Sequence, residues 1–214
     1  MMLRLSALVI FLLGFMGLLF HSGLIAKRRI RDGFFCYYTN LSNVLAVFYE
    51  LLLGAAGHDP DGGLFRFLSA PATALTVTLT IYVTHLIFHW VLVPTAKKYG
   101  EDGLRALGAG TFGNVWVHYL IPWMVVVQWL LWQDKSGLTL LHGALWLVLP
   151  LLYFAFAMVR AQTGKPIGHT NDLYPYPFMD YPRLGAKRFW RNIAAMLLAF
   201  FLLGCLFVGI AQLI

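Results

Sequence analysis

The sequence contains little charge. Asp, Glu, Lys and Arg make up 12% of its 214 residues, and nine residues are acidic. Hydrophobic residues account for 60% of the chain, which is more than a soluble domain could keep away from its surface. The composition therefore excludes a soluble protein and predicts an integral membrane protein. The length suits a single bundle over residues 1–214 rather than two domains.

Cysteine is also scarce, because the chain has only Cys36 and Cys205. Both lie in apolar segments, and the topology predicted below puts them in opposite leaflets. A disulfide requires Cα atoms within about 7 Å of each other, so we expect no disulfide. Cysteine usage therefore gives no indication of the compartment.

A cleavable signal peptide is not expected. Such a peptide carries its positive charge before its apolar core. Here Arg4 stands alone before the first apolar run, while Lys27, Arg28, Arg29 and Arg31 follow it. We therefore expect the first segment to be retained as a helix.

Long apolar runs, in contrast, are abundant. A membrane-spanning helix needs about 20 mainly apolar residues. Six stretches meet this requirement: residues 5–25, 34–53, 73–93, 111–132, 138–160 and 189–213. We therefore predict an all-α, polytopic membrane bundle of six transmembrane helices.

The basic residues indicate how these spans are oriented. Thirteen of the 16 Lys and Arg residues lie in or beside the first, third and fifth loops. Lys and Arg are enriched in loops on the cytoplasmic side of membrane proteins, so we expect both termini on the non-cytoplasmic side. The net charge of +7 is thus explained by membrane topology and anionic lipid headgroups, and we expect no nucleic acid partner.

Polar residues interrupt three of the spans at a similar depth. Thr39, in the second span, lies roughly 7 to 8 Å below the cytoplasmic edge at a helix rise of about 1.5 Å per residue. His85 and His89 approach the same edge in the third span, and His118 in the fourth. Polar residues at such a depth indicate a functional site, although Ser, Thr and Asn also hold packed membrane helices together.

Nucleophilic catalysis is the first chemistry that this layer suggests. A hydroxyl becomes a good nucleophile when a neighbouring base takes its proton, so Thr or Ser beside His is the minimum set for acyl transfer. We expect Thr39 to be the nucleophile and His118 the base. Ser42 is the competing nucleophile, and His85 either competes as the base or orients it. The candidate donors to an oxyanion are the side-chain amides of Asn40, Asn43 and Asn114.

A metal site is the second possibility. His85 and His89 are four residues apart on one helical face, and His118 could add a third ligand of a zinc site. The sequence lacks the Glu of an HExxH motif after His85, and no carboxylate lies in this half of the helices to support the ligands. We therefore expect no cofactor and keep a His-ligated, zinc-dependent membrane hydrolase as an alternative.

A non-enzymatic lipid-binding or transport bundle is the third possibility. Transporters often have internal repeats and broken helices around a site at the midplane of the membrane. The sequence shows no internal repeat and no broken helix, and the polar layer lies away from the midplane. These features favour an enzyme over a transporter.

Residues 172–180 form a rigid aromatic segment on the predicted cytoplasmic side. Pro restricts the backbone, and Tyr favours the headgroup level of a membrane. The segment is therefore either an interfacial belt or a lid over the polar layer. As a lid it would place Tyr174, Tyr176 and Phe178 along the substrate, with one of the two tyrosines as a hydrogen-bond donor.

Three stretches, taken together, resemble a known family. They are residues 38–43 (Tyr-Thr-Asn-Leu-Ser-Asn), residues 118–132 (His-Tyr-Leu-Ile-Pro-Trp through Gln-Trp-Leu-Leu-Trp) and residues 173–180 (Leu-Tyr-Pro-Tyr-Pro-Phe-Met-Asp). In order and spacing they are similar to bacterial six-helix membrane proteins related to the androgen-induced protein and the androgen-dependent TFPI-regulating protein of animals. The resemblance covers most of the chain.

This resemblance implies a membrane-embedded threonine hydrolase that cleaves fatty acid esters of hydroxy fatty acids. The essential Thr of the family matches Thr39, and its essential His matches His118. We accordingly expect a multi-pass protein of a bacterial inner membrane, with membrane lipids and a long-chain lipid ester as partners. The roles suggested for Asn40 and Asn43 come from the residues and not from the resemblance.

Overall fold

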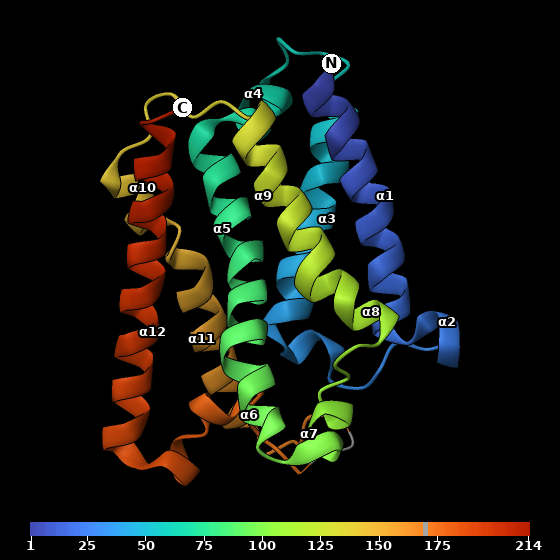
Figure 1. The fold of residues 1–214 in the computed structure, drawn as a ribbon, viewed down its shortest axis with the longest axis vertical. Helices are drawn as coiled ribbons and strands as arrows, with labels where there is room; N and C mark the ends of the chain where they lie inside the picture. The colour runs from blue at the N-terminus through green and yellow to red at the C-terminus, as the bar shows by residue number, and fades with distance from the viewer. Residues whose placement is uncertain (169–170) are drawn as a thin grey trace.

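The computed structural model describes residues 1–168 and 171–214, and in this part of the chain all regular structure is helical. Six helices or series of helices are long and apolar enough to cross a membrane (Figure 1). They are Met2–Ser22, Tyr38–Ala56, Pro71–Lys97, Phe112–Trp132, Leu140–Ala161 and Tyr181–Ala211. The predicted class, an all-α bundle of six membrane-spanning helices, is confirmed.

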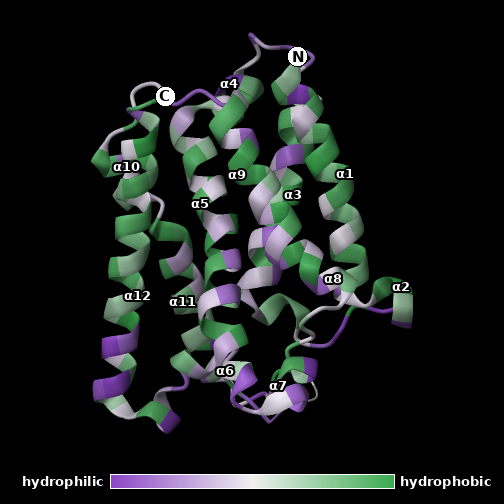
Figure 2. Cartoon of the chain, viewed as in Figure 1, coloured by the Kyte–Doolittle hydropathy of each residue, from purple (hydrophilic) through white to green (hydrophobic). Residues whose placement is uncertain are grey.

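Both ends of the chain lie at the same end of the bundle, which we call the terminal end (Figure 1). The opposite end, which we call the loop end, carries the short helices α2 (Leu24–Lys27), α6 (Val93–Lys97) and α7 (Gly100–Ala106). Hydrophilic residues gather around α6 and α7 and on the loop-end part of α12 (Tyr181–Ala211), whereas the sides of the bundle are mostly hydrophobic (Figure 2). This distribution suits a molecule whose sides face lipid.

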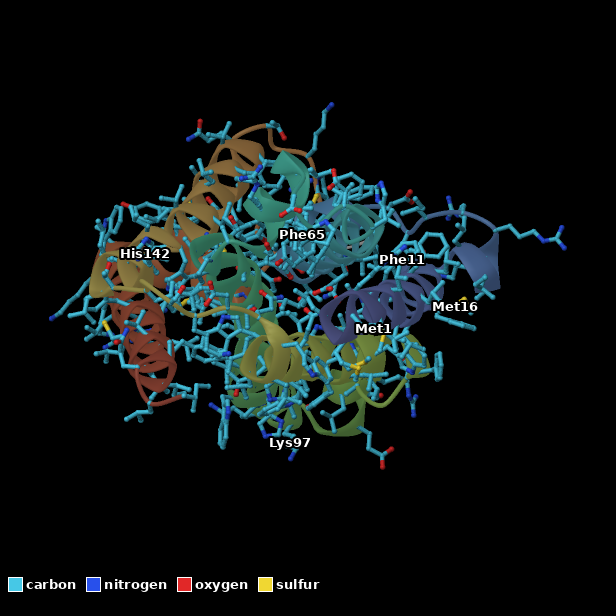
Figure 3. The ribbon with its side chains drawn as sticks, turned by 90° about the horizontal axis from the view of Figure 1, so that it is seen from above. Met1, Phe11, Met16, Phe65, Lys97 and His142 are labelled. Atoms are coloured by element: carbon cyan, nitrogen blue, oxygen red, sulfur yellow. The ribbon has the colours of Figure 1, made fainter. Side chains whose placement is uncertain are left out.

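Four helices pack against one another: α1 (Met2–Ser22), α3 (Tyr38–Ala56), α5 (Pro71–Ile87) and α9 (Ile121–Trp132). The pair α10 (Leu140–Leu145) and α11 (Val148–Ala161) lies with α12 on one side. Seen from above, His142 on α10 lies at one edge of the bundle and Met16 on α1 at the opposite edge (Figure 3). The centre of the bundle is therefore formed by α3, α5 and α9, with α1 packed on their outer side.

Small residues allow the helices to approach one another closely. A Cβ atom added at Gly54 of α3 would come within 2.7 Å of the Leu8 side chain of α1. Likewise, a Cβ atom at Gly14 would come within 2.5 Å of the Val47 side chain. Lipid provides no hydrophobic driving force between helices, so close packing of this kind holds a membrane bundle together.

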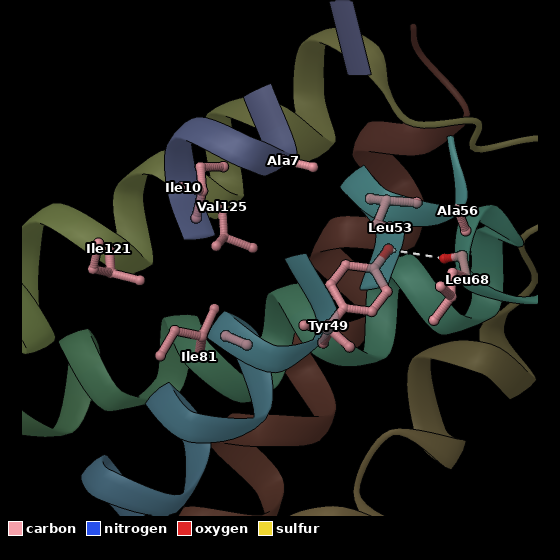
Figure 4. Packing of buried hydrophobic residues seen from close by; sticks show 11 residues of the cluster. Ala7, Ile10, Tyr49, Leu53, Ala56, Leu68, Ile81, Ile121 and Val125 are labelled. Atoms are coloured by element: carbon pink, nitrogen blue, oxygen red, sulfur yellow. Dashed lines mark hydrogen bonds between the residues drawn. The ribbon is translucent and has the colours of Figure 1, made fainter. Parts of the chain in front are cut away.

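The terminal half of the centre is filled by an apolar cluster (Figure 4). Ile10 of α1, Leu53 of α3 and Val125 of α9 meet there and are almost completely buried. The Tyr49 hydroxyl donates a hydrogen bond of 2.9 Å to the Leu68 carbonyl, which satisfies the one polar atom of its side chain. The polar layer therefore lies in the other half of the bundle.

Two of the spans contain a π-helical turn, in which one extra residue widens the helix. In the third span the turn is Phe88–Leu92, between α5 and α6. In the fourth it is Trp116–Leu120, between α8 (Phe112–Val115) and α9. A proline follows each turn closely, and proline has no N–H with which to continue the helical hydrogen-bond ladder. Both spans nevertheless remain continuous helices, so the π turns change their hydrogen-bond ladder without breaking them.

The predicted start of the second span is also wrong, because α3 begins at Tyr38 and not at residue 34. The segment Phe34–Cys36 forms a separate 3₁₀ turn, and Tyr37 then takes an extended conformation with φ −97° and ψ 134°. Apolar composition continues through this turn, so hydropathy could not reveal it. The shift places Thr39 in the first turn of α3.

The other span boundaries move for local reasons. The first span ends at Ser22 because Gly23 has φ 85°, a left-handed conformation that stops the helix. The sixth span begins at Tyr181, where Asp180 accepts a hydrogen bond from the Arg183 N–H, and it bends at Gly185, whose φ is 70°. The fifth span is divided into α10 and α11.

Candidate functional site

Buried polar side chains from three spans meet at the loop end of the bundle. They come from α3, from the end of α5 and from the fourth span, and they are Thr39, Asn40, Ser42, Asn43, Thr84, His85, Asn114 and His118. The structure therefore brings together the hydroxyl and the imidazole that the sequence pattern indicates.

Thr39 and His118 are in direct contact. The Thr39 Oγ1 atom lies 3.3 Å from the His118 Nε2 atom. The two residues are 8% and 5% exposed, so bulk water does not separate them. A distance of this size is suitable for proton transfer between a nucleophile and a base.

The second ring nitrogen of His118 determines which atom is the donor in the hydrogen bond between Thr39 and His118. His118 Nδ1 lies 3.0 Å from the Asn114 carbonyl oxygen, and a carbonyl oxygen can only accept a hydrogen bond. Nδ1 must therefore carry a hydrogen, which leaves Nε2 of the neutral ring as the acceptor. It follows that the Thr39 hydroxyl donates its hydrogen bond to His118, as a nucleophile donates to a general base.

The π turn that holds His118 is linked to α5 by its backbone. Pro122 has no N–H to offer to the carbonyl of His118, four residues earlier. That carbonyl instead accepts a hydrogen bond of 3.0 Å from His85 Nδ1. His85 thus orients the backbone of His118, and it does not contact Thr39.

Phe88 covers one face of the His118 imidazole. The two rings are stacked, with centroids 3.8 Å apart and planes 25° apart. Phe88 is the first residue of the other π turn and is 2% exposed. The two widened helical turns therefore face each other through this pair of rings, and together they fix the position of the base.

Ser42, the competing nucleophile, makes no hydrogen bond to an imidazole in the part of the chain that the structure describes. Its hydroxyl lies 2.7 Å from Thr84 Oγ1 and donates a hydrogen bond of 3.0 Å to the Thr39 carbonyl. These contacts join α3 to α5. The geometry therefore favours Thr39 over Ser42 as the nucleophile.

The three candidate amides all point at backbone carbonyls. Asn43 Nδ2 donates to the carbonyls of Thr39 and Val117, at 2.8 and 3.0 Å, which uses both of its hydrogens. Asn40 and Asn114 donate to the carbonyls of Phe34 and Leu107, at 2.6 and 3.2 Å. In this structure these amides anchor the backbone around Thr39 and His118.

The alternative zinc site is not assembled. His118 uses both ring nitrogens in its contacts with Thr39 and Asn114, and His85 uses Nδ1. His89 is exposed, and its Nδ1 lies 3.1 Å from the Tyr119 hydroxyl. Among the described residues, no group of three or more His, Cys, Asp or Glu side chains is placed to hold a metal ion.

The aromatic segment of the last loop folds over Thr39. The Tyr176 hydroxyl accepts a hydrogen bond of 3.4 Å from the Thr39 backbone N–H, and Tyr176 is 7% exposed. Burial raises the pKa of the Tyr176 phenol above its ordinary value, so the group keeps its proton and can donate it to a hydrogen bond. Phe178 stacks on Tyr176, with ring centroids 5.1 Å apart, and Tyr174 packs at the edge of the same cluster.

Two cavities meet at Thr39. The first, which we call the helix cavity, lies between α3, α5, α11 and α12. Its wall is apolar away from Thr39, with Val83, Phe154, Ile193, Met196 and Phe200 among its residues. The second, which we call the loop cavity, is the larger of the two and is lined by His118 and by the loops at the loop end.

The wall between the two cavities contains Thr39, Phe88, Leu92 and Tyr176, because these residues line both. The Thr39 hydroxyl is therefore placed where a ligand could extend to either side of it.

The polar residues of the terminal half form a separate network. Gln128 Nε2 donates hydrogen bonds to Glu50 Oε2 at 2.9 Å and to Ser6 Oγ at 3.1 Å. His142 lies in the first turn of α10, where its Nδ1 accepts a hydrogen bond from the Thr139 N–H. In the described part of the chain, the hydrogen bonds of Glu50, Gln128 and His142 thus go to residues other than Thr39 and His118.

Sequence reasoning missed Phe88 and His21. Phe88 carried no signal, because an apolar residue in an apolar span is expected everywhere. His21 could have been selected from the sequence, because it is a polar residue at the loop end of the first span. Its ring lies edge-on to the His118 ring, with centroids 5.9 Å apart, and it lines the loop cavity.

Comparison of the chain with protein-family models, curated proteins and solved structures found no match. The function of the chain is therefore inferred from the geometry of Thr39, His118 and the two cavities beside them.

Proposed function

We propose that this protein is a membrane-embedded hydrolase of lipid esters, in which Thr39 is the nucleophile and His118 the general base. The observation that carries this proposal is the buried contact of 3.3 Å between Thr39 Oγ1 and His118 Nε2. The Asn114 carbonyl supports it, because it fixes the tautomer in which Nε2 is the acceptor. Such a pair meets the minimum requirement for acyl transfer.

In the acylation step, Thr39 Oγ1 forms a bond to the acyl carbon while its proton passes to His118 Nε2. The bond from the acyl carbon to the alcohol oxygen then breaks, and His118 returns the proton to that oxygen. In the deacylation step a water molecule attacks the acyl-threonine and gives its proton to His118. The fatty acid leaves, and Thr39 Oγ1 regains the proton.

The negative charge that develops on the acyl oxygen needs hydrogen-bond donors. Two donors lie beside the nucleophile: the Thr39 N–H, whose bond to Tyr176 is long at 3.4 Å, and the Tyr176 O–H. Thr39 also lies in the first turn of α3, where the helix dipole favours negative charge. We assign the oxyanion to this place rather than to the asparagine amides.

The substrate is a long-chain lipid ester. The apolar wall of the helix cavity suits an acyl chain, and the position of the cavity inside the bundle suits a lipid that enters from the membrane. The family resemblance of the sequence points to fatty acid esters of hydroxy fatty acids as one such class. The setting that we propose is a bacterial inner membrane, with both termini on the non-cytoplasmic side and the site in the cytoplasmic leaflet.

A fluorophosphonate probe, which reacts with activated hydroxyl nucleophiles, tests this proposal. We expect the purified protein to be labelled at Thr39 and to hydrolyse long-chain esters. Both properties should be lost in Thr39→Ala and in His118→Ala. Thr78→Ala is the matched control, because the Thr78 hydroxyl is also buried but bonds only to the Ala74 carbonyl, at 2.8 Å.

Full labelling of Thr39→Ala would contradict the proposal and transfer the role to another hydroxyl. Activity that is lost with a chelator, without any labelling, would favour the zinc alternative. Lipid that copurifies with a protein unable to cleave any ester would favour a lipid-binding or transport function. The folded state of each variant is checked by its thermal melting in detergent.

A further inference from the structure

Because Thr39 lies in the wall between two cavities, an ester bound there has one part in each. The helix cavity is apolar apart from the hydroxyls near Thr39, which suits the acyl chain. The loop cavity must then hold the alcohol part. Its charged and polar residues are informative about the kind of alcohol that fits.

The loop cavity contains two guanidinium groups. Arg31 comes from the loop after α2, and Arg183 from the start of α12. Asp32 and Asp172 line the cavity as well, so the cavity as a whole is not strongly positive. A preference for a negatively charged substrate must therefore come from a single guanidinium. Arg31 is the candidate, because it is bonded to His21.

Arg31 is fixed by its surroundings. Its backbone N–H donates a hydrogen bond of 2.9 Å to the Ser22 carbonyl, and its guanidinium donates to the His21 carbonyl. Its side chain runs over Gly23, where a Cβ atom would come within 3.1 Å of Arg31 Cγ. In the described part of the chain, the guanidinium has no carboxylate within ion-pair distance.

This guanidinium is also bonded to a residue that neighbours His118. It donates to the backbone carbonyl of His21, and the centroid of the His21 ring lies 5.9 Å from that of the His118 ring. Partial burial lowers the pKa of Arg31 below its ordinary value, because burial disfavours the charged form of the guanidinium. An anion on the substrate would favour the charged form, and Arg binds phosphate and carboxylate through paired hydrogen bonds.

We propose that the loop cavity binds an anionic group on the alcohol part of the ester, within a few bonds of the ester oxygen, and that Arg31 is its main ligand. A glycerol phosphate has this arrangement, and so does a short hydroxy acid. The carboxylate at the far end of a long hydroxy fatty acid does not. This inference rests on the proposed ester hydrolase function and specifies the substrate of that site.

Three oleoyl esters test the inference on the full-length protein in detergent. Oleoylglycerol phosphate carries the anion near the ester, oleoylglycerol lacks it, and the oleoyl ester of a long hydroxy fatty acid carries it far away. We expect kcat/KM for the phosphate ester to exceed that for the other two roughly tenfold to hundredfold, as for a hydrogen bond to a charged group. An oleoyl ester of a short hydroxy acid separates phosphate from carboxylate as the preferred anion.

The preference should depend on Arg31. In Arg31→Gln the ratio of kcat/KM for oleoylglycerol phosphate and oleoylglycerol should fall close to one, and Arg31→Lys should keep part of it. Lys27→Gln is the matched control, because it removes a positive charge from the neighbouring end of α2, at a residue that is exposed like Arg31 but does not line the cavity. There the ratio should stay unchanged.

Equal rates for the charged and neutral esters, or a ratio that survives in Arg31→Gln, would overturn the inference. So would a preference for the remote carboxylate. Binding can be measured separately in Thr39→Ala, which lacks the proposed nucleophile. In this variant oleoylglycerol phosphate should raise the melting temperature more than oleoylglycerol does. If inorganic phosphate alone has the same effect, the site belongs to free phosphate and not to a lipid. If no ester is cleaved at all, it is the hydrolase function that fails.

Discussion

At the scale of single residues, His118 differs from the histidine of a Ser-His-Asp triad in what orients it. There a buried carboxylate accepts the hydrogen bond from Nδ1. Here a backbone carbonyl does so, that of Asn114, at 3.0 Å. A neutral acceptor suits this position, because a carboxylate inside a membrane is costly. The orientation of His118 is therefore set by main-chain atoms and by the stacked ring of Phe88.

Tyr176→Phe tests the oxyanion donor. The substitution keeps the ring and removes the O–H beside Thr39, so we expect kcat to fall roughly 10²- to 10³-fold, as when one oxyanion donor is removed. KM should change little, since the ring still fills the cluster. Because burial raises the pKa of Tyr176, the phenol stays protonated, and its ionisation should not reduce activity at pH values up to about 10.

The matched control is Tyr49→Phe, which removes a hydroxyl bonded to the Leu68 carbonyl in the terminal half of the bundle. Its effect should appear as a lower melting temperature with kcat unchanged. An unaltered kcat in Tyr176→Phe would place the oxyanion elsewhere.

Among the individual residues, the sequence predicted the chemical groups better than their partners. Thr39, His118 and Tyr176 could be selected because polar groups are conspicuous in apolar spans. The partners of Asn40, Asn43 and Asn114 could not, because their amides bond to backbone carbonyls that no side-chain pattern reveals. Phe88 was hidden for the opposite reason, since it is one apolar residue among many.

At the scale of the elements, hydropathy predicted six spans and their order but not the irregular turns that shape the site. The 3₁₀ turn Phe34–Cys36 moved the start of α3 to Tyr38, and this shift places Thr39 in its first turn. The π turns Phe88–Leu92 and Trp116–Leu120 have the same apolar composition as their helices. A closer reading of Pro94 and Pro122 would have indicated that the hydrogen-bond ladder is interrupted there.

Gly204→Val tests the packing of α12 against α10. A Cβ atom at Gly204 of α12 would collide with the Gly143 carbonyl oxygen of α10 and would come within 2.7 Å of Trp146 Nε1. We expect overpacking to cost about 1–3 kcal/mol of stability, measured as a lower melting temperature in detergent. Labelling at Thr39 should persist below that temperature, because Thr39 and His118 themselves belong to α3 and to the fourth span.

Gly209→Val is the matched control on the same helix. A Cβ atom there meets nothing within 4 Å, so the melting temperature should stay close to that of the parent protein. If both variants melt at the temperature of the parent protein, the close approach of α10 and α12 does not contribute to stability.

At the scale of the whole molecule, the even number of spans puts both ends of the chain at the terminal end (Figure 1). The loop end carries most of the basic residues and also the site. We expect the loop end to face the cytoplasm, because the distribution of Lys and Arg sets the orientation of membrane proteins. The site then lies beside the more negatively charged surface of the membrane.

Fusions to alkaline phosphatase, which is active only outside the cytoplasm, test this orientation. A fusion at the C-terminus or after Ser136 should be active, and a fusion after Lys165 should be inactive. Fusions to a protein that fluoresces only in the cytoplasm should give the reverse pattern. Phosphatase activity of the Lys165 fusion alone would mean that the orientation is the reverse of the one expected. Activity of both the Ser136 and the Lys165 fusions would contradict the single span between these two residues.

The place of Thr39 in a shared wall has a kinetic consequence for the proposed hydrolase. Once the acyl group is attached to Thr39, the alcohol lies alone in the loop cavity and can depart while the chain stays in the helix cavity. Water can reach the acyl-threonine beside His118 only after that departure. The two products should therefore leave in a fixed order, with the alcohol first and the fatty acid second. Added fatty acid should compete with the intact ester for the empty protein, whereas added alcohol should recapture the acyl group and reform an ester.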